Sequence, residues 1–362
     1  MAIGAVETSA PPLSRFAHID ALRAVAVMIV VLAHAGLSHV VPGGSGVTIF
    51  FTISGFIITW ALLREEGGTR TFAVGKFYAR RALKIMPPLA ITIIFPALAY
   101  WAVHGLDGGA LLSQLLFTYN WYPATETTPA ILPGSDVVWS LAIEEQFYIA
   151  FSLVWVLVLR THRPLSWLMV LSVGTIVYAN LARLSFALGD VSSDRIYYGF
   201  DTRADGLALG ILAALVLRRV QRDRTTLPRF RSLMANPAVL GLALFIYLAS
   251  LGIRSPLFRD TIRYALQSTA TAIAILYGFM GSPAGRERLT RFSSARPVLV
   301  VGQASYSIYL VHFVLFAAIG DRLQVLPLGL RALMLATVGI GAGVLLWQFV
   351  ERPLEAVRKR LH

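Results

Sequence analysis

Three side chains in the first long apolar segment are of types that exchange protons or bind anions: Asp20, Arg23 and His34. Ionisable groups are costly in hydrocarbon, so each is a candidate functional residue. At about 100° and about 1.5 Å per residue, His34 returns to within about 20° of Arg23 and lies about 16 Å further along the axis. In that line His34 could be a general base. The alternatives are an interhelical hydrogen bond for His34 and an interfacial anchor paired with Asp20 for Arg23.

Two adjacent carboxylates, Glu144 and Glu145, lie within the apolar segment 136–159. Neighbouring positions on a helix point about 100° apart, so the two can serve different partners. One could face Arg23 or Arg203, while the other could orient a histidine, as a carboxylate does in a catalytic triad. A buried ion pair that fixes helix register is the competing interpretation.

Two later apolar segments also carry polar groups. One begins with Arg203 and Asp205, which indicate either a substrate contact or an ion pair at the outer interface. The other contains Tyr306, Tyr309 and His312, which recur every three residues and share one helix face. A stripe of this kind is typical of packing or of a substrate-binding surface.

A basic segment follows the second apolar run and precedes a Pro-Pro pair. We predict a loop here, because proline interrupts helices. The cations could contact anionic lipid and set topology, or they could clamp a phosphate, for which arginine has a matching fork of donors. The four cations are Lys76, Arg80, Arg81 and Lys84.

The elements that must position these residues follow from composition. Of 362 residues, 56% are hydrophobic and 14% charged, whereas soluble domains average about 45–50% and about 25%. The apolar residues form runs long enough to cross about 30 Å of hydrocarbon as helices. We therefore predict an all-α, polytopic transmembrane bundle of about ten spanning helices, with segment 110–120 too short to span. The predicted spans are 19–41, 46–63, 85–103, 136–159, 165–182, 200–217, 236–253, 261–281, 298–319 and 327–350.

Positive charge predicts the orientation of the bundle. One set of alternate connections holds 23 of the 32 Lys and Arg residues and the other holds 7, so the richer side is expected in the cytoplasm. The prediction is a cytoplasmic tail 1–18, a transmembrane bundle 19–353 and a basic cytoplasmic tail 354–362. We expect the first apolar run to be retained, because no signal-peptide pattern precedes it. The net charge of +13 belongs to these connections, so no nucleic-acid partner is predicted.

Seven stretches, taken in order, resemble the acyltransferase family 3 of bacterial membrane proteins. Together they span residues 19 to 353, and the ordered set is more specific than any one motif. The stretches are Ile19-Asp20-Ala21-Leu22-Arg23-Ala24-Val25-Ala26 with His34; Gly46-Val47 through Phe50-Phe51 to Ser54-Gly55-Phe56-Ile57; Tyr78-Ala79-Arg80-Arg81; Trp139-Ser140-Leu141 with Glu144-Glu145-Gln146-Phe147-Tyr148; Arg203-Ala204-Asp205; Ser305-Tyr306-Ser307-Ile308-Tyr309-Leu310 with His312; and Glu351-Arg352-Pro353.

The resemblance implies a ten-helix protein of the bacterial inner membrane that takes an acyl group, commonly acetyl, from cytoplasmic acyl-coenzyme A. The acceptor would be a hydroxyl of a sugar, polysaccharide, lipid or small molecule. By the family pattern, Arg23 and His34 form the essential pair and the basic motif from Arg81 contacts the donor. We expect Arg80 and Lys84 to share in holding the donor's phosphates. No metal is predicted, and the absence of cysteine excludes thiolate chemistry.

The sequence departs from the family pattern at two positions. Lys84 replaces a usual second arginine and offers phosphate a point charge without a bidentate fork. Thr48 stands where an acidic residue is common. The fused extracellular hydrolase-like domain of some members is not expected here.

In the resulting hypothesis the donor's long arm follows the first helix, and His34 deprotonates the acceptor hydroxyl that attacks the thioester. Glu144 or Glu145 would hold the imidazole. Direct transfer is expected rather than an acyl-enzyme on Ser140 or His34, because no nucleophile-elbow pattern is present. The residues expected to bind the acceptor are Asp20, Trp139, Arg203, Tyr306, Tyr309 and His312.

Two other classes of protein are compatible with intramembrane charges. A transporter could use Asp, Arg, His and Glu as a proton or substrate pathway, although no inverted repeat supports it. A membrane scaffold would need none of these residues for chemistry. Consumption of the donor thioester that depends on His34 separates the enzyme from both.

Overall fold

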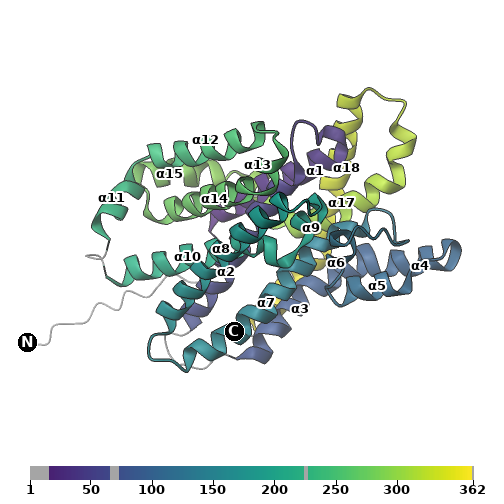
Figure 1. Cartoon of the computed structure of the whole chain (residues 1–362). Coiled ribbons are helices and arrows are strands. Elements are labelled where there is room, and N and C mark those ends of the chain that lie inside the picture. Colours follow the sequence, from purple (N-terminus) through teal and green to yellow (C-terminus); the bar gives the residue numbers. More distant parts are fainter. Residues whose placement is uncertain (1–15, 66–72, 224–226, 361–362) are drawn as a thin grey trace, which may run out of the picture.

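The computed structural model describes residues 16–65, 73–223 and 227–360, and all regular structure in these ranges is helical (Figure 1). The α-helices are α1 Ala17–Leu32, α2 Gly43–Glu65, α3 Val74–Leu89, α4 Phe95–His104, α5 Gly108–Leu115, α6 Trp121–Ala124, α7 Val138–Leu159, α8 Pro164–Leu188, α9 Ser193–Tyr198, α10 Phe200–Arg222, α11 Pro228–Ala235, α12 Ala238–Gly252, α13 Pro256–Asp260, α14 Ile262–Met280, α15 Pro283–Ser293, α16 Arg296–Gln303, α17 Ser305–Ile319, α18 Leu328–Leu346 and α19 Arg352–Lys359. Three π-helical turns, η1 Ala33–Leu37, η2 Ala90–Ile94 and η5 Trp347–Glu351, and two 3-10 turns, η3 Ser135–Val137 and η4 Gly320–Leu323, extend or join them.

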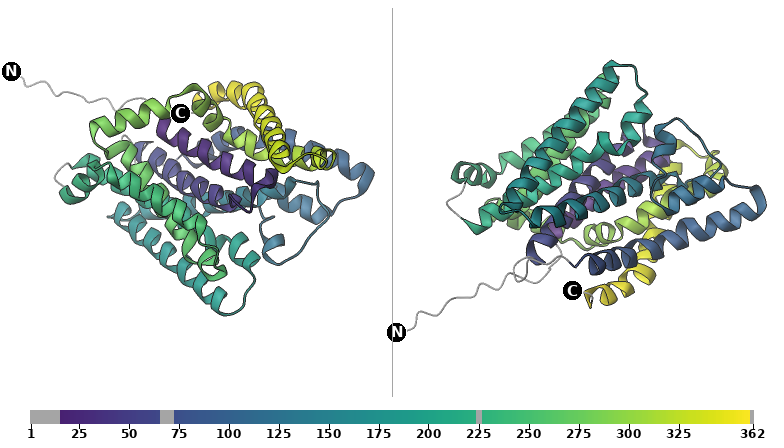
Figure 2. Two further views of the ribbon diagram at one scale, coloured as in Figure 1. Left: turned by 90° about the horizontal axis from the view of Figure 1, so that it is seen from above. Right: turned by 60° about the horizontal axis from the view of Figure 1, so that its bottom comes forward.

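Helices α1 and α2 run through the middle of the bundle (Figure 2). α2 packs against α1, α10 and α14, while α1 also packs against α16 and α17. Helices α8, α10, α12 and α14 lie on one side of this central pair, and α3, α17 and α18 lie on the other. Consequently, one face of α2 looks toward α10 and α14, and another toward α3, α7 and α17.

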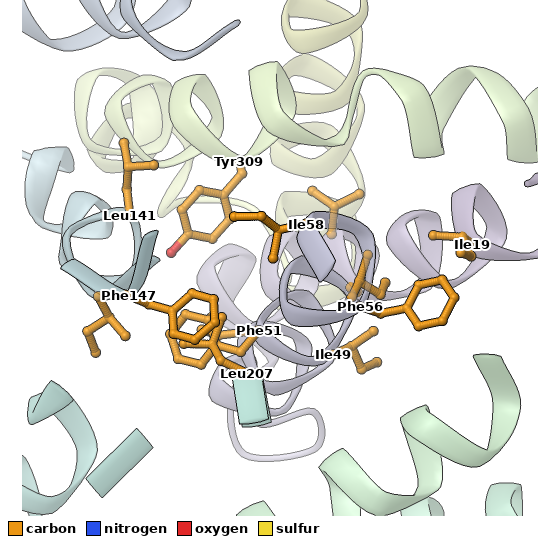
Figure 3. Packing of buried hydrophobic residues seen from close by; sticks show 14 of the residues in the cluster. Ile19, Ile49, Phe51, Phe56, Ile58, Leu141, Phe147, Leu207 and Tyr309 are labelled. Atoms are coloured by element: carbon orange, nitrogen blue, oxygen red, sulfur yellow. The ribbon is translucent and has the colours of Figure 1, made fainter. Parts of the chain in front are cut away.

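The apolar core is built around α2. Phe51 and Phe56 are almost completely buried, and Leu207 of α10 packs into the same cluster (Figure 3). Close backbone contact is possible because small residues stand at the crossing: a side chain on Gly55 would collide with the Leu207 carbonyl, and one on Gly210 with the Thr52 carbonyl. Small residues at helix contacts are the usual means of close packing in membranes.

The prediction of a polytopic transmembrane helix bundle is confirmed, but the number of helices that qualify as spans is smaller than ten. Among the described residues, seven helices are long and apolar enough to cross a membrane, and α11 with α12 forms an eighth candidate bent by 75°. The predicted segments 200–217 and 261–281 are helical as α10 and α14. They carry buried polar side chains, including Arg203, Asp205 and Gln267, and they pack inside the bundle instead of presenting a purely apolar surface.

The prediction that the basic segment is a loop was wrong. Residues 74–104 form one continuous helical element, α3–η2–α4, so the helix begins eleven residues before the predicted start at 85. Pro87 and Pro88 do not break it. The π-helical turn η2 follows directly and absorbs the hydrogen-bond pattern that the prolines disturb, and the Thr92 hydroxyl donates to the Pro88 carbonyl at 2.8 Å.

Other boundaries also differ from the prediction. The first span ends at Leu37 rather than 41, because η1 widens the helix and Gly36 adopts a φ of 106°. The predicted segment 298–319 is two helices, α16 and α17, joined at Ala304. At the C-terminal side, α18 continues through η5 into α19, so residues 354–359 are helical and pack against α3. Segment 110–120 contains only the short α5, as expected for a piece that does not span.

Glycine at the crossing of α2 and α10 generates a stability prediction. Gly55→Ala or Gly210→Ala should lower the free energy of unfolding by about 1–3 kcal/mol, because the added methyl group meets backbone that cannot move aside. The measurement is thermal unfolding of the detergent-solubilised protein, followed by tryptophan fluorescence. Gly241→Ala on α12 is the control, since no atom lies within 4 Å of its added carbon. Equal midpoints for all three variants would contradict the close-packing argument.

Candidate active site

A cavity of about 400 Å³ opens between α1, α2, α3, α7, α17 and α19. Its wall on α2 runs from Val47 to Leu62, a length of about 22 Å at about 1.5 Å per residue. Most of this wall is aliphatic. The cations come from the first half of α1, from the middle of α3 and from α19. The cationic lining residues are Arg23, Arg80, Arg81, Lys84 and Arg358.

Arg81 of α3 is held at the cavity by an ion pair and an aromatic ring. One terminal nitrogen of its guanidinium lies 2.5 Å from Oε1 of Glu145, and the guanidinium carbon lies 3.2 Å from the centre of the Tyr148 ring. Glu145 is therefore the ion-pair partner of Arg81. The hypothesis that Glu145 orients His34 is contradicted by this contact.

Glu144 lines the cavity and accepts a hydrogen bond from the Tyr148 hydroxyl at 3.3 Å. Glu144 faces the cavity, whereas Glu145, the next residue on α7, points about 100° away from it toward Arg81. Among the described residues no histidine is bonded to Glu144, so a carboxylate–histidine contact is not observed for it either. Both carboxylates belong to the cationic part of the site.

Arg23 and Tyr306 join the cavity to α17 and α3. Nε of Arg23 donates to the Ser305 hydroxyl at 3.1 Å, and the Tyr306 hydroxyl donates to the Ile85 carbonyl at 3.0 Å. Both residues line the cavity. Asp20 is also buried, but its backbone packs against Gly302 of α16 and its side chain is outside the lining.

His34 lies in the π-helical turn η1 and faces His312 of α17. Nδ1 of His34 and Nε2 of His312 are 2.8 Å apart, and Nδ1 of His312 is 3.0 Å from the Ile308 carbonyl. A carbonyl can only accept, so Nδ1 of His312 carries a hydrogen and its Nε2 accepts from Nδ1–H of His34. The lone pair on Nε2 of His34 is then available. The ring of Phe313 stacks on His34 at 4.2 Å and holds its plane.

Tyr309 connects the cavity with the histidine pair. It lines the deep end of the cavity, and its ring centre is 6.0 Å from that of His312, one turn further along α17. Its hydroxyl is 3.0 Å from the Val137 carbonyl and 2.7 Å from the hydroxyl of Ser140. These contacts hold the ring between the cavity and the histidines.

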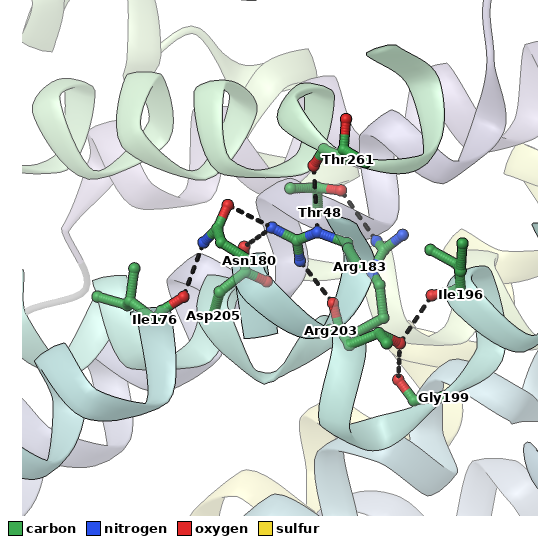
Figure 4. A network of polar contacts seen from close by, with 10 residues as sticks. Thr48, Ile176, Asn180, Arg183, Ile196, Gly199, Arg203, Asp205 and Thr261 are labelled. Atoms are coloured by element: carbon green, nitrogen blue, oxygen red, sulfur yellow. Dashed lines mark hydrogen bonds and ion pairs between the residues drawn. The ribbon is translucent and has the colours of Figure 1, made fainter. Parts of the chain in front are cut away.

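Arg203 and Trp139, two predicted acceptor contacts, belong to a separate cluster on the other side of α2. The Arg203 guanidinium donates to the Thr48 hydroxyl at 3.0 Å (Figure 4). The ring centres of Trp139 and Tyr197 are 4.8 Å apart. The expected pairing of Arg203 with Asp205 is not observed, because Asp205 forms a 2.7 Å ion pair with Arg183.

Arg183 is the hub of this outer cluster. Its guanidinium also donates to the backbone carbonyls of Thr202 and Thr261 and to the side chain of Asn180. Nearby, Arg195 and Asp201 form two hydrogen bonds of 2.8 Å each. The hydrogen bonding of the Asp201 carboxylate raises the pKa of Arg195. These contacts fix α9 against the beginning of α10.

Several site residues were missed by sequence reasoning. Arg358 enters the cavity because α19 folds back against α3, and Ser305 receives Arg23 because α17 begins there. Arg358 lay in a segment that the sequence predicted only as a basic tail. Arg183 and Arg263 looked like loop charges near the helix ends, yet both are buried.

Comparison with known proteins identifies this arrangement. A family described as an acyltransferase domain, acyltransferase 3, matches residues 16–349. The chain belongs to this family. Two similar proteins are O-acetyltransferase OatA of Staphylococcus aureus, which is 28% identical over 316 residues, and peptidoglycan O-acetyltransferase OatA of Listeria monocytogenes, which is 26% identical over 349 residues. The putative peptidoglycan O-acetyltransferase YrhL of Bacillus subtilis is 30% identical over 320 residues.

These alignments cover 82%, 93% and 82% of this chain, but 49%, 55% and 48% of the respective relatives. The chain therefore spans about half the length of the curated relatives it matches. No solved structure matches it. In the part of the acyltransferase 3 chain that the structure describes, no group of three or more His, Cys, Asp and Glu side chains could hold a metal ion.

The Arg81–Glu145 pair generates a second stability prediction. Arg81→Met should cost about 3 kcal/mol of unfolding free energy, because Glu145 is left with a buried, uncompensated charge. Arg81→Met combined with Glu145→Met should recover most of that loss. Chemical denaturation in detergent measures both. Arg291→Met, which breaks the exposed pair with Glu287, is the control and should change stability by less than about 0.5 kcal/mol. A double variant less stable than the single one would contradict the argument.

Proposed function

We propose that this chain is an O-acyltransferase of the bacterial inner membrane that moves an acyl group, most simply acetyl, from cytoplasmic acyl-coenzyme A to a carbohydrate hydroxyl. The observation that carries the proposal is the cationic cavity whose deep wall, Tyr309, adjoins the paired His34 and His312. The family membership supports the reaction class. The positive-inside rule supports a cytoplasmic location for the cationic helix ends and for both termini.

The lining of the cavity fits a donor of this kind. Coenzyme A combines several phosphate charges with a long flexible arm. Arg80, Arg81 and Arg358 offer guanidinium forks that match phosphate oxygens, and Lys84 and Arg23 add charge on the same side. The aliphatic wall along α2 suits the arm. An acyl thioester at the deep end would then lie beside Tyr309.

The histidine pair can supply the proton transfer. Nε2 of His34 takes the proton from the acceptor hydroxyl as its oxygen bonds to the acyl carbon, and the carbon–sulfur bond breaks. The imidazolium then returns the proton to the departing thiolate, so coenzyme A leaves as the thiol. His312 is a positioning residue, because it acts on the reaction through Nδ1 of His34. This route needs no acyl-enzyme.

The acceptor is proposed from the relatives. Two of the three that are named above carry peptidoglycan in their names. Soluble peptidoglycan fragments are therefore the first acceptors to test. Tyr306 and Tyr309 line the space between donor and base, where an acceptor hydroxyl must arrive.

Donor binding is the first test of the proposal. Calorimetry with acetyl-coenzyme A should give saturable binding to wild type, and Arg80→Ala, Lys84→Met or Arg358→Ala should each raise Kd about tenfold, because one charge-assisted contact is lost. Arg288→Ala on the exposed helix α15 is the matched control and should bind as wild type. No binding by folded wild type would overturn the donor assignment and favour a transport role for the intramembrane charges.

The roles of the two histidines can be separated kinetically. His34→Ala should lower kcat for thiol release with peptidoglycan fragments by about 10²–10⁴-fold, because the base is removed. His312→Ala should lower kcat by about tenfold, since one orienting hydrogen bond is lost, and His312→Gln should restore part of it. The Kd for acetyl-coenzyme A should stay unchanged in all three variants. A rise in Kd without a fall in kcat would assign the pair to donor binding instead.

A further inference from the structure

Two buried arginines, Arg203 of α10 and Arg263 of α14, lie together on the face of α2 that is turned away from the donor cavity. Their exposed fractions are 1% and 8%. Both guanidiniums adjoin the Tyr264 ring, at 3.8 and 5.7 Å from its centre. Neither residue lines the cavity with the cations described above.

These guanidiniums are incompletely satisfied. One terminal nitrogen of Arg203 donates to Thr48, but the other has no hydrogen-bond partner among the described residues, and neither has Nε of Arg263. In the same part of the chain, neither arginine forms an ion pair with a carboxylate. The nearby Asp205 carboxylate forms its ion pair with Arg183 of α8. The cluster therefore holds an excess of positive charge.

Such an arrangement is costly unless something completes it. A buried charge without a counterion is strongly disfavoured, and the aromatic faces around Arg203 compensate only part of that cost. Helix α2 begins beside the cluster, at Gly43, and its N-terminus adds partial positive charge. The two guanidiniums and the N-terminus of α2 thus favour an anion at this position.

The cluster also has an approach and a place beside the base. Tyr197 is half-buried, its ring centre is 5.3 Å from the Arg203 guanidinium, and it packs directly on Gly44 at the start of α2. Trp139 lies against Tyr197, which provides a second flat aromatic surface. Gly43 packs on Ala33, the residue before His34. The start of α2 therefore adjoins the turn η1 that carries His34.

We propose that Arg203 and Arg263 bind an acidic group, a carboxylate by preference, on the acceptor, and so select anionic carbohydrate over neutral carbohydrate. The statement that the bound molecule is the acceptor rests on the proposed acyl transfer. The anion site itself does not depend on that proposal. Thr48 leaves the positive charge of Arg203 available to a ligand, because its hydroxyl accepts a hydrogen bond from Arg203 without neutralising the charge. An aspartate at position 48 would be a built-in counterion.

The experiment exploits this position. Calorimetry at fixed ionic strength compares methyl glucuronoside with methyl glucoside on the detergent-purified full chain, with glucose 6-phosphate as a phosphate arm. Wild type should bind the glucuronoside more tightly than the glucoside. Thr48→Asp should weaken glucuronoside binding about tenfold or more, since the new carboxylate competes for Arg203, whereas the neutral Thr48→Asn should not. Arg263→Gln should weaken it as well, and Arg322→Gln, at an exposed position of the 3-10 turn η4, should have no effect.

Binding of acetyl-coenzyme A is measured on the same samples. It should be unchanged by Thr48→Asp, which shows that the variant is folded and separates the two proposals. Equal binding of glucuronoside and glucoside, or glucuronoside binding that survives both Thr48→Asp and Arg263→Gln, would overturn the anion site. Tighter binding of glucose 6-phosphate than of glucuronoside would overturn the preference for a carboxylate. A wild type that binds glucuronoside but not acetyl-coenzyme A would overturn only the donor assignment.

Discussion

The ion pair between Arg81 and Glu145 allows a cationic cavity to exist inside an apolar bundle. A bilayer supplies no water to a buried guanidinium, so its charge must be balanced by neighbouring groups. Glu145 balances Arg81 directly, and the Tyr148 ring covers its flat face. With Arg81 fixed, the remaining cations can stay at the cavity surface, where an anionic ligand can reach them. The two adjacent carboxylates of α7 therefore belong to the charge balance of the cavity, and in the proposed mechanism the histidines carry the proton.

Helix α2 places the cationic cavity and the cluster around Arg203 on two different faces. Its small residues bring α1 and α10 close on two sides, because Gly46 meets the Ala26 carbonyl and Gly55 meets the Leu207 carbonyl. One face of α2 forms the long aliphatic wall of the cavity, and its first turns carry Thr48 toward Arg203. The separation of the two polar regions is thus a consequence of close helix packing. A looser contact would let water and charges mix between them.

Sequence reasoning located the intramembrane charged residues, but it did not predict their contacts. Intramembrane position alone singled out Arg23, His34 and Glu145, since charged groups in apolar runs are detectable without a structure. Their partners depend on features that periodicity does not encode. The π-helical turn at residues 33–37 alters the 100° spacing used to place His34, and the helix that continues through Pro87 brings Arg81 to α7. Arg358 could not be predicted, because its position depends on the fold of α19 against α3.

The choice of histidine rather than a carboxylate to orient His34 has a physical reason. A carboxylate beside the imidazole would have to be buried as an anion, at the high desolvation cost that Glu145 avoids by pairing with Arg81. His312 is neutral in its resting form and ends its chain of hydrogen bonds on the Ile308 carbonyl, which is already part of α17. The pair therefore fixes the tautomer of His34 without adding net charge. In the proposed mechanism, charge arises only when His34 takes a proton, so the protein would bear the cost of a buried imidazolium solely during the reaction.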